Sequence, residues 1–269
     1  MSFQYEPIAA ALDYERRITS EELALIVDIG GGTSDFTVVR LSPDRHNMID
    51  RRDDFLANNG VHIGGTDFDR RLAVTSVMQY FGMGEPLAHR PSLKMPGHYY
   101  FDLATWHKIH LLYDQSVLRE LRELRPTLQN KTPIDRLLEL LTHRKGHQLA
   151  TLVENAKIEL SAASQASVPL ASLLQSFDDI EDCVVTRAQL EAALADDCRR
   201  IFNALDQTLL QAGLTHQQID TVFTTGGSTA LPLLVQGIGA ACPNATVVAG
   251  DLYNSVGAGL LTEALKRYR

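Results

Sequence analysis

The stretch LALIVDIGGGTSDFTVVRL, residues 23–41, decides how this chain folds. The apolar runs Leu23–Val27 and Thr37–Leu41 predict two core strands. Between them stand Asp28, three consecutive glycines and Asp35, which is more polarity and backbone freedom than a plain hairpin turn needs. Glycine lets a backbone come close to a ligand, and phosphate is the usual ligand of such loops. The stretch therefore predicts a phosphate-binding turn between two strands.

Two further glycine turns have the same setting. Gly64 and Gly65 follow an apolar segment and precede a predicted helix, and Gly226 and Gly227 do the same. Backbone amides at the start of a helix attract anions, so each turn adds to the evidence for phosphate binding. None of the turns fits the GxxxxGK[ST] or GxGxxG fingerprints, which predicts that the phosphate site belongs to another fold.

Composition and charge exclude several classes of protein. The 269 residues are 45% hydrophobic and 22% charged, which is ordinary for a soluble globular protein with a large core. The net charge of −8 argues against nucleic acid and against a membrane surface as partners. No long apolar run or signal peptide is visible. Three widely spaced cysteines without a CxxC pair predict thiols in a cytoplasmic protein.

The remaining segments alternate between strands and helices. Helices are predicted over 7–17, after the glycine turn in 61–82, over most of 104–128 and 133–163, and over 251–267, and residues 186–214 are predicted to form either a helix pair or one long bent helix. Further strands are predicted within 42–60, 166–177 and 245–250, and a strand followed by a helix within 219–242. Prolines and glycines punctuate 83–105, which predicts a long loop. Thr186 is the expected N-cap of its helix, and Gly213 is the expected stop.

Seven motifs, in this order along the chain, resemble motifs of the DnaK-type heat-shock chaperones, which belong to the actin-like ATPase superfamily. They are YEPIAAALDY (5–14), VDIGGGTSDF (27–36), VHIGGTDFDRRL (61–72), VENAKIELSAASQASVPL (153–170), VTRAQLEAAL (185–194), VFTTGGSTALPLL (222–234) and DLYNSVGAGLL (251–261). The stretch FQYEPIAAALDYE and the ending SVGAGLL are most similar to the short, divergent YegD-like branch.

The resemblance implies an α/β fold. Its core would be an actin-like ATPase (ribonuclease H-like) subdomain with a mixed sheet and flanking helices, formed by residues 1–63 and 195–269. A mainly helical α+β subdomain would be inserted at 64–194, with an enlarged helical insertion near 83–150. The 269 residues contain no first phosphate loop similar to GIDLGTTNS and no counterpart of the first-lobe lysine. We therefore expect the chain to represent the second lobe of the nucleotide-binding unit, with Met1 as a truncated start.

The resemblance also implies the phosphate end of a site for ATP or ADP with Mg²⁺. Glu6 and Asp28 are the carboxylates expected to act on Mg²⁺ or on the attacking water, and Asp35 is a candidate for the water shell of Mg²⁺. A helix-start role for Glu6, a turn-capping role for Asp28 and a loop role for Asp35 are the structural alternatives. The residues implied to wrap or approach the phosphates are Gly30, Gly31, Gly32, Thr33, Gly64 and Gly65.

The nucleoside end is implied by later motifs. Glu154, Lys157 and Ser161 share one helix face, which in the family hydrogen-bonds ribose and adenine, although the spacing alone fits a solvated face. The resemblance adds Gly226, Gly227, Ser228 and Asp251. Ile158 and Ala230 replace family arginines, and Thr66 replaces an acidic residue. We expect weaker or altered adenine recognition, because the cation–π contact of the first arginine is lost.

Three functions are compatible with these motifs. The first is the ATP/ADP-binding second lobe of a chaperone-like protein. In the full-length protein this lobe and the first lobe would together hydrolyse ATP, and clients and co-chaperones would be the partners. This chain alone would be inactive, because phosphoryl transfer needs groups on both sides of the phosphate and the chain supplies those of one lobe. The second is a non-enzymatic interaction or scaffold module that uses 83–150. A sugar or acetate kinase is a third reading, disfavoured by GGTDFD and ENAKIELS.

A histidine metal site at 107/110 or 143/147 lacks supporting cysteines or acidic residues.

Overall fold

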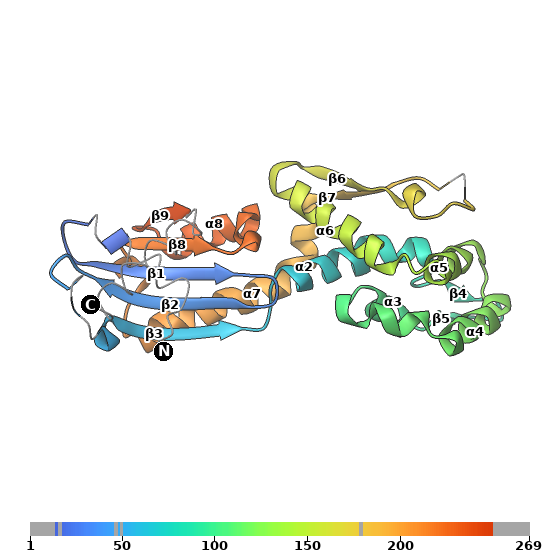
Figure 1. Cartoon of the computed structure of the whole chain (residues 1–269), viewed down its shortest axis with the longest axis horizontal. Coiled ribbons are helices and arrows are strands. Elements are labelled where there is room, and N and C mark those ends of the chain that lie inside the picture. Colours follow the sequence, from blue (N-terminus) through green and yellow to red (C-terminus); the bar gives the residue numbers. More distant parts are fainter. Residues whose placement is uncertain (1–13, 16–17, 46–47, 49–50, 178–179, 250–269) are drawn as a thin grey trace, which may run out of the picture. The chain divides into compact units, whose positions relative to one another are not determined.

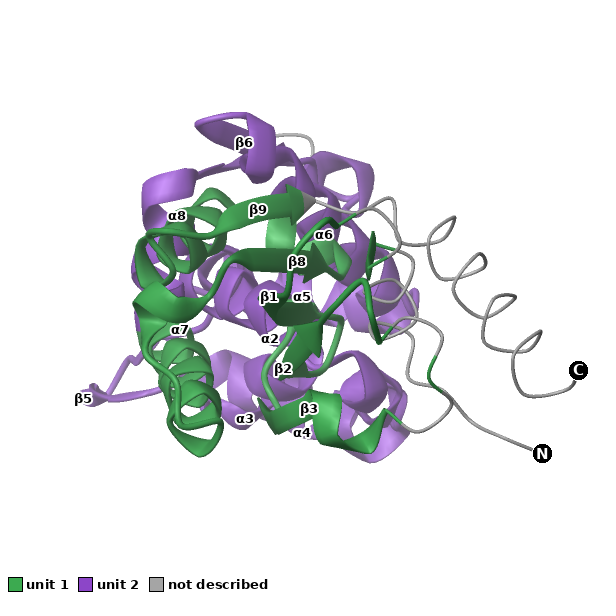
Figure 2. Ribbon diagram, turned by 90° about the vertical axis from the view of Figure 1, so that its left-hand side faces the viewer, with its two compact units in different colours: residues 1–65, 196–269 green, residues 66–195 purple. Residues whose placement is uncertain are grey.

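The computed structural model describes residues 14–15, 18–45, 48, 51–177 and 180–249. The chain divides into two compact units (Figure 2). Unit 1 contains residues 1–65 and 196–269, and unit 2 contains residues 66–195. The helix predicted over 7–17 lies outside the described residues except for 14–15, and the helix predicted over 251–267 lies outside them entirely.

Unit 1 is built on a five-stranded mixed sheet with the strand order β3-β2-β1-β8-β9 (Figure 1). β1 (Glu22–Ile29) and β2 (Ser34–Leu41) pair in antiparallel orientation, and β3 (Phe55–Val61) pairs antiparallel with β2. β8 (Thr221–Thr225) runs parallel to β1, and β9 (Thr246–Ala249) runs parallel to β8. The two strands predicted on either side of the glycine loop are therefore confirmed.

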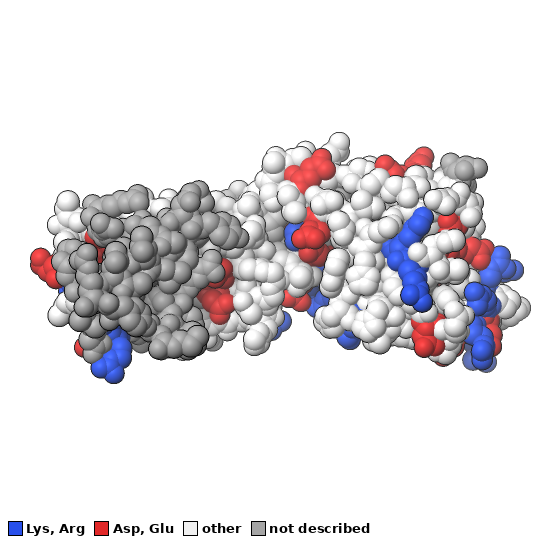
Figure 3. Space-filling model, in the orientation of Figure 1, with Lys and Arg blue, Asp and Glu red and all other residues white. Residues whose placement is uncertain are grey.

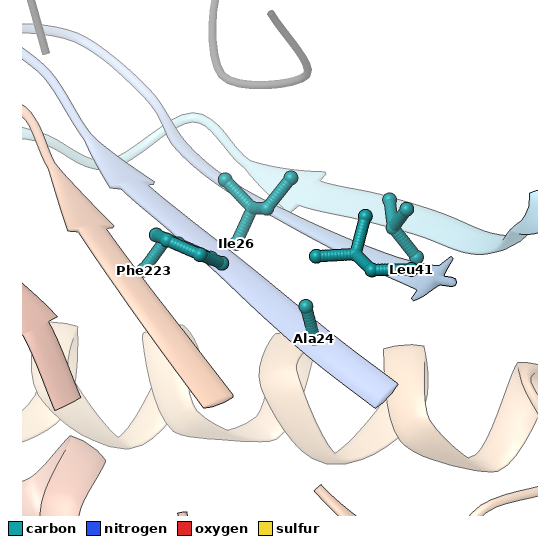
Figure 4. Close-up of a cluster of buried hydrophobic side chains, with 5 residues drawn as sticks. Ala24, Ile26, Leu41 and Phe223 are labelled. Carbon is teal, nitrogen blue, oxygen red and sulfur yellow. The ribbon is translucent and has the colours of Figure 1, made fainter. Parts of the chain in front are cut away.

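One face of this sheet carries a tight apolar cluster (Figure 4). Ala24, Ile26, Val39, Leu41 and Phe223 are all buried and come from three adjacent strands. Ala24 and Ile26 are two residues apart, so the alternation of a strand brings both to the same face. Burying each large side chain of this kind contributes roughly 1.5–3 kcal/mol, so the cluster holds the three strands in one register.

The long helix α7 (Arg187–Gln211) begins and ends as its sequence predicts. The backbone N–H of Gln189 donates to Thr186 Oγ1 at 3.2 Å, and the N–H of Thr186 donates to Gln189 Oε1 at 2.8 Å, which is a reciprocal capping box. Gly213 has φ +69° beyond the last turn, and the N–H groups of Gly213 and Leu214 donate back to carbonyls of that turn. The segment 186–214 thus contains one long helix, Arg187–Gln211, and of the two predicted alternatives the helix pair is wrong.

A buried ion network ties two segments of unit 1 together. Both carboxylate oxygens of Glu15 accept hydrogen bonds from Arg51, at 2.8 and 2.6 Å, and one also accepts the N–H of Ser42 at 2.8 Å. Arg51 also contacts Asp54, which pairs with Arg45 at 2.7 Å. Glu15 and Asp54 are each 1% exposed, so their charges depend on these partners.

Unit 2 opens with a continuous run of helical turns. α2 (Gly65–Leu72) passes into a π-helical turn (Ala73–Val77) and then a 3₁₀ turn (Met78–Phe81), which ends at Gly82 with φ +105°. The helix predicted after the second glycine turn is confirmed, although its later turns are irregular. Left-handed glycine is the usual stop for such a run.

The prediction of a long loop over 83–105 is wrong. The segment forms a hairpin of β4 (Pro86–Leu87) and β5 (Arg90–Lys94), followed by α3 (His98–Leu103). Every residue of β5 is exposed, and such a strand tolerates a proline. Tyr100 on α3 is fully buried, and its hydroxyl donates to the carbonyl of Phe81 at 3.2 Å. The burial of Tyr100 in the tertiary structure therefore outweighs the local preference for a loop that the prolines and glycines indicate.

The helices predicted over 104–128 and 133–163 are confirmed. The first region comprises a 3₁₀ helix η4 (Trp106–Tyr113), α4 (Gln115–Leu124) and η5 (Arg125–Thr127), and the second comprises α5 (Thr132–Thr142) and α6 (Gly146–Ala162). The second region is broken at Arg144, which has φ +54°. The hydroxyl of Tyr113 bridges this break by donating to Arg144 O at 3.2 Å and accepting from Gly146 N at 3.1 Å.

The short elements complete the description. They are η1 (Arg52–Asp54), β6 (Gln165–Val168), η6 (Leu170–Ser172), β7 (Cys183–Thr186), η7 (His216–Gln218), η8 (Gly227–Ala230) and α8 (Pro232–Ala241). Charged side chains of both signs lie near α4 and α5 in Figure 3, and Arg125 pairs with Asp135 there at 2.8 Å. No helix in the described part of the chain has the length and hydropathy that a membrane crossing requires.

Replacing Arg51 by methionine should lower the free energy of unfolding by about 3 kcal/mol or more, because Glu15 then stays buried without its cation. Arg40→Met is the matched control: Arg40 lies 3.7 Å from Glu21 in an exposed pair, which contributes less than about 1 kcal/mol. Urea unfolding measures both. Equal losses in the two variants would contradict the structural role of the buried network.

Candidate functional site

The three glycine turns meet at one carbonyl group. The carbonyl oxygen of Gly30 accepts the backbone N–H of Gly65 at 2.9 Å and the hydroxyl of Ser228 at 3.1 Å. The N–H of Gly30 donates to Thr33 O at 3.0 Å and closes the four-residue loop between β1 and β2. The loop is thus held by a hydrogen bond between two of its own residues and by hydrogen bonds from two other segments of unit 1.

Two of the glycines are required by close backbone packing. A Cβ on Gly64 would lie 2.7 Å from both Gly31 C and Gly32 N, and neither backbone atom can move without distorting the loop. Gly226 has φ +83°, and a Cβ on it would lie 2.2 Å from the carbonyl oxygen of Ile29. The absence of a side chain at these two glycines therefore lets their backbone pack directly against residues in and next to the loop.

Other glycines face open space. A Cβ on Gly31, Gly32 or Gly227 would meet no heavy atom within 4 Å, so these positions are not required by packing. Gly31, Gly32 and Thr33 are exposed, whereas Ser34 directly after them is buried and donates to Ile63 O at 2.8 Å. A group such as a phosphate can therefore approach the backbone of this loop, and side chains there would obstruct it.

Two carboxylates stand at the base of the loop. Asp28 on β1 and Asp35 on β2 are direct cross-strand partners, and both are half-buried. Directly opposite residues of an antiparallel pair share a face, and like charges in that position destabilise a sheet. Asp28 lies close to Gly226, and Asp35 lies close to Gly60, because a Cβ on either glycine would come within 3.0 Å of the carboxylate. A divalent cation with its water shell would compensate both charges.

The residues fit Mg²⁺ bound largely through phosphate. Mg²⁺ keeps several waters and takes one or two carboxylates plus phosphate oxygens, rather than a complete set of protein ligands. Asp28 and Asp35 supply that number. The described residues include no group of three or more His, Cys, Asp or Glu side chains that could hold a metal ion by itself.

The predicted nucleoside face lies on α6 of unit 2. Lys157 is largely buried, and its ammonium group lies 2.8 Å from Asp69 Oδ1 on α2, whereas Glu154 is exposed and Ser161 is half-buried. Burial raises the pKa of Asp69 above its ordinary value, and this effect outweighs the opposite one of Lys157. Asp69 was not predicted as a site residue, and no local sequence signal indicated its pairing with Lys157, because its place near the start of α2 suits a carboxylate through the helix dipole alone.

The structure brings together only some of the predicted site residues. Those joined around the Gly30 carbonyl and its loop are Asp28, Gly30, Gly31, Gly32, Thr33, Asp35, Gly64, Gly65, Gly226, Gly227 and Ser228. Glu154, Lys157 and Ser161 lie on unit 2. Glu6 and Asp251 lie outside the described residues. The ligand-binding roles of all of these stay predictions.

The mixed five-stranded sheet with flanking helices is that of an actin-like ATPase nucleotide-binding domain. The model of the family described as Hsp70 protein matches residues 113–263, which is more than half of the 269 residues. The chain belongs to the Hsp70 family.

Curated relatives agree with this assignment. A chaperone protein DnaK from Deinococcus deserti is 28% identical over 251 residues, which cover 90% of this chain and 31% of that protein. The stromal 70 kDa heat shock-related protein of Spinacia oleracea chloroplasts is 26% identical over 247 residues, covering 90% of this chain and 32% of that protein. A chaperone protein dnaK from Cyanidioschyzon merolae is 28% identical over 234 residues, with 86% and 29% covered. The chain spans about a third of the length of these relatives.

The alanine variants of Gly64 and Gly32 should separate support of the loop from access to it. Gly64→Ala should lower the free energy of unfolding by about 2 kcal/mol, because its Cβ would overlap the loop backbone. Gly32→Ala should change it by less than about 0.5 kcal/mol, since its Cβ points into open space. Urea unfolding of both variants checks this, and an equal loss in Gly32→Ala would show that the loop is not open.

Proposed function

We propose that this chain is the second lobe of the nucleotide-binding domain of an Hsp70-type chaperone of the YegD-like branch, and that it binds ATP or ADP with Mg²⁺. The observation that carries the proposal is the meeting of three glycine turns at the Gly30 carbonyl, beside an open loop and two facing carboxylates. In this proposal unit 1 is the core subdomain, and unit 2 is the inserted subdomain, enlarged near 83–150.

The proposed roles at the phosphate end follow from what each group can donate or accept. Backbone amides of Gly31, Gly32 and Thr33 and the Thr33 hydroxyl donate to the β- and γ-phosphates, and the Gly65 turn approaches them. Asp28 and Asp35 accept hydrogen bonds from the waters of Mg²⁺, whose charge offsets that of the phosphates. Glu6 is assigned to the attacking water or to Mg²⁺ by resemblance alone.

The proposed nucleoside contacts lie on two segments. On α6, Glu154, Lys157 and Ser161 offer groups that hydrogen-bond ribose hydroxyls and a base, and the Asp69 pairing holds the Lys157 ammonium in place. Gly226, Gly227, Ser228 and Asp251 are assigned to the nucleoside and α-phosphate by the family resemblance. Ile158 is 58% exposed and provides no cation to stack on a base.

In the full-length protein, ATP binding and hydrolysis would be coupled to movement of the two lobes. The proposed partners are the nucleotide, the first lobe of the same protein, client proteins and co-chaperones. We also propose a cytoplasmic location, although some of the relatives are chloroplast proteins. The relatives that bear chaperone names support the chaperone assignment.

Asp28→Asn should weaken the binding of Mg·ADP at least about tenfold and remove its dependence on Mg²⁺, because the amide no longer attracts a cation. Calorimetric titration with ADP, with and without Mg²⁺, measures both effects. The matched control is Asp44→Asn, which changes an exposed carboxylate of the same unit. Equal affinities in the two variants would contradict the proposed role of Asp28, and a scaffold module would show no Mg·ADP binding at all.

The chain alone should release phosphate from ATP no faster than buffer does. Phosphoryl transfer needs groups placed on both sides of the reacting phosphate, and the 269 residues carry one phosphate loop of the family pair. Steady-state phosphate release from pure protein measures this. Turnover that Asp28→Asn abolishes would show that this lobe is catalytically complete.

A further inference from the structure

The sheet of unit 1 carries a row of polar side chains at the end next to the glycine loop. Asp35 on β2 is paired with Asp28 on β1, and Asp28 is paired in turn with Thr225 on β8. Residues that stand opposite one another on neighbouring strands project to the same face of a sheet. Two carboxylates and one hydroxyl therefore come from three adjacent strands at one level.

The same face is apolar one step further from the loop. Ile26 and Phe223 stand two residues before Asp28 and Thr225 on their strands, and both are buried on this face (Figure 4). The three side chains of the polar row are only half-buried. The apolar cluster thus ends at this row, and ligands of α/β sheets bind outside the carboxyl ends of the strands, which is where the row lies on β1 and β8.

The two carboxylates of the row lean toward different strands. A Cβ on Gly60 of β3 would overlap Asp35 Oδ1, and a Cβ on Gly226, directly after β8, would lie 3.0 Å from Asp28 Oδ1. Asp35 therefore leans toward β3, and Asp28 leans toward the end of β8. This separation reduces the repulsion between the two charges, and it brings Asp28 to the side of the row on which Thr225 stands.

The hydroxyl of Thr225 makes no hydrogen bond with any residue that the structure describes. The other threonines of this face differ in that respect. Thr221, four residues earlier on β8, donates to Glu22 Oε2 at 2.7 Å, and Thr37 Oγ1 on β2 accepts from Asn58 Nδ2 at 2.7 Å. A half-buried polar group without a protein partner is satisfied by water or by a ligand. The free hydroxyl stands beside the carboxylate that we assign to the cation.

We propose that Thr225 is a positioning residue of the cation site, and that its hydroxyl oxygen accepts a hydrogen bond from a water of the Mg²⁺ shell beside Asp28. The inference rests on the proposed function and adds one residue to the metal end of the same site. Mg²⁺ keeps several waters, and each of them has protons to donate. The protein must therefore supply acceptors, and a carboxylate and a hydroxyl oxygen on neighbouring strands are two of them.

The position of Thr225 favours a water of the cation over a phosphate oxygen. Its neighbour in the row is the Asp28 carboxylate, whose negative charge repels a phosphate that approaches from the same side. The open backbone that suits a phosphate lies in the loop instead, at Gly31 and Gly32. A hydroxyl also adds an acceptor to the row without adding a third negative charge.

Calorimetric titration with pyrophosphate, with and without Mg²⁺, tests the role of the hydroxyl. Thr225→Val keeps the shape of the side chain and removes the hydroxyl. This variant should bind Mg·pyrophosphate about three- to tenfold more weakly, because one hydrogen bond to the water shell is lost, and should bind metal-free pyrophosphate like the parent chain. Thr225→Ser keeps the hydroxyl and should bind Mg·pyrophosphate like the parent chain.

Two further variants separate this role from an effect on folding. Thr224→Val is the matched control, because Thr224 is also half-buried but is paired with Val27 and projects to the opposite face. It should bind Mg·pyrophosphate like the parent chain. In a chain that already carries Asp28→Asn, Thr225→Val should cause no further loss, because both residues act through the same cation.

The outcomes distinguish this inference from the proposed function. If the parent chain and Thr225→Val bind Mg·pyrophosphate equally well, the role of Thr225 is overturned and the proposed function stands. Equal losses with and without Mg²⁺ in Thr225→Val would assign the hydroxyl to the phosphate and would also overturn the inference. If the parent chain binds pyrophosphate in neither condition, the proposed function fails, and the role of Thr225 fails with it.

Discussion

The carbonyl oxygen of Gly30 is the point on which the geometry of the candidate site depends. It accepts one hydrogen bond from the Gly65 amide and one from the Ser228 hydroxyl, and Ser228 lies 198 residues away in sequence. With both lone pairs engaged, this peptide unit cannot rotate without losing two bonds. A loop that is held before its ligand arrives pays less ordering entropy on binding, which is the advantage of such support.

The sheet topology explains why distant segments reach this carbonyl. β1 and β8 run parallel, with Asp28 opposite Thr225, so the loop after β1 and the turn after β8 emerge at the same edge of the sheet. Ligands of α/β sheets bind outside the carboxyl ends of their strands. Close approach then requires Gly64 and Gly226, whose missing side chains let three backbone segments touch.

Local sequence signals predicted the elements whose causes are local. The apolar runs of β1 and β2, the Thr186 cap and the Gly213 stop all depend on residues close in sequence, and each is confirmed. The segment 83–105 was wrongly predicted as a loop, because burial of Tyr100 is decided by tertiary packing. The break at Arg144 was missed for a similar reason, since the Tyr113 hydroxyl that bridges it comes from another element.

The candidate site was predictable in its residue types but not in its contacts. Glycines and aspartates at strand ends indicated phosphate and a cation, yet the Asp69–Lys157 pair joins separate helices and has no local signature.

The measurement that tests the account most directly is the NMR shift of backbone amides during titration with Mg·pyrophosphate. The account predicts the largest saturable shifts at Gly31, Gly32 and Thr33. Saturable shifts confined to other residues, or no shifts at all, would contradict a phosphate cradle at this loop.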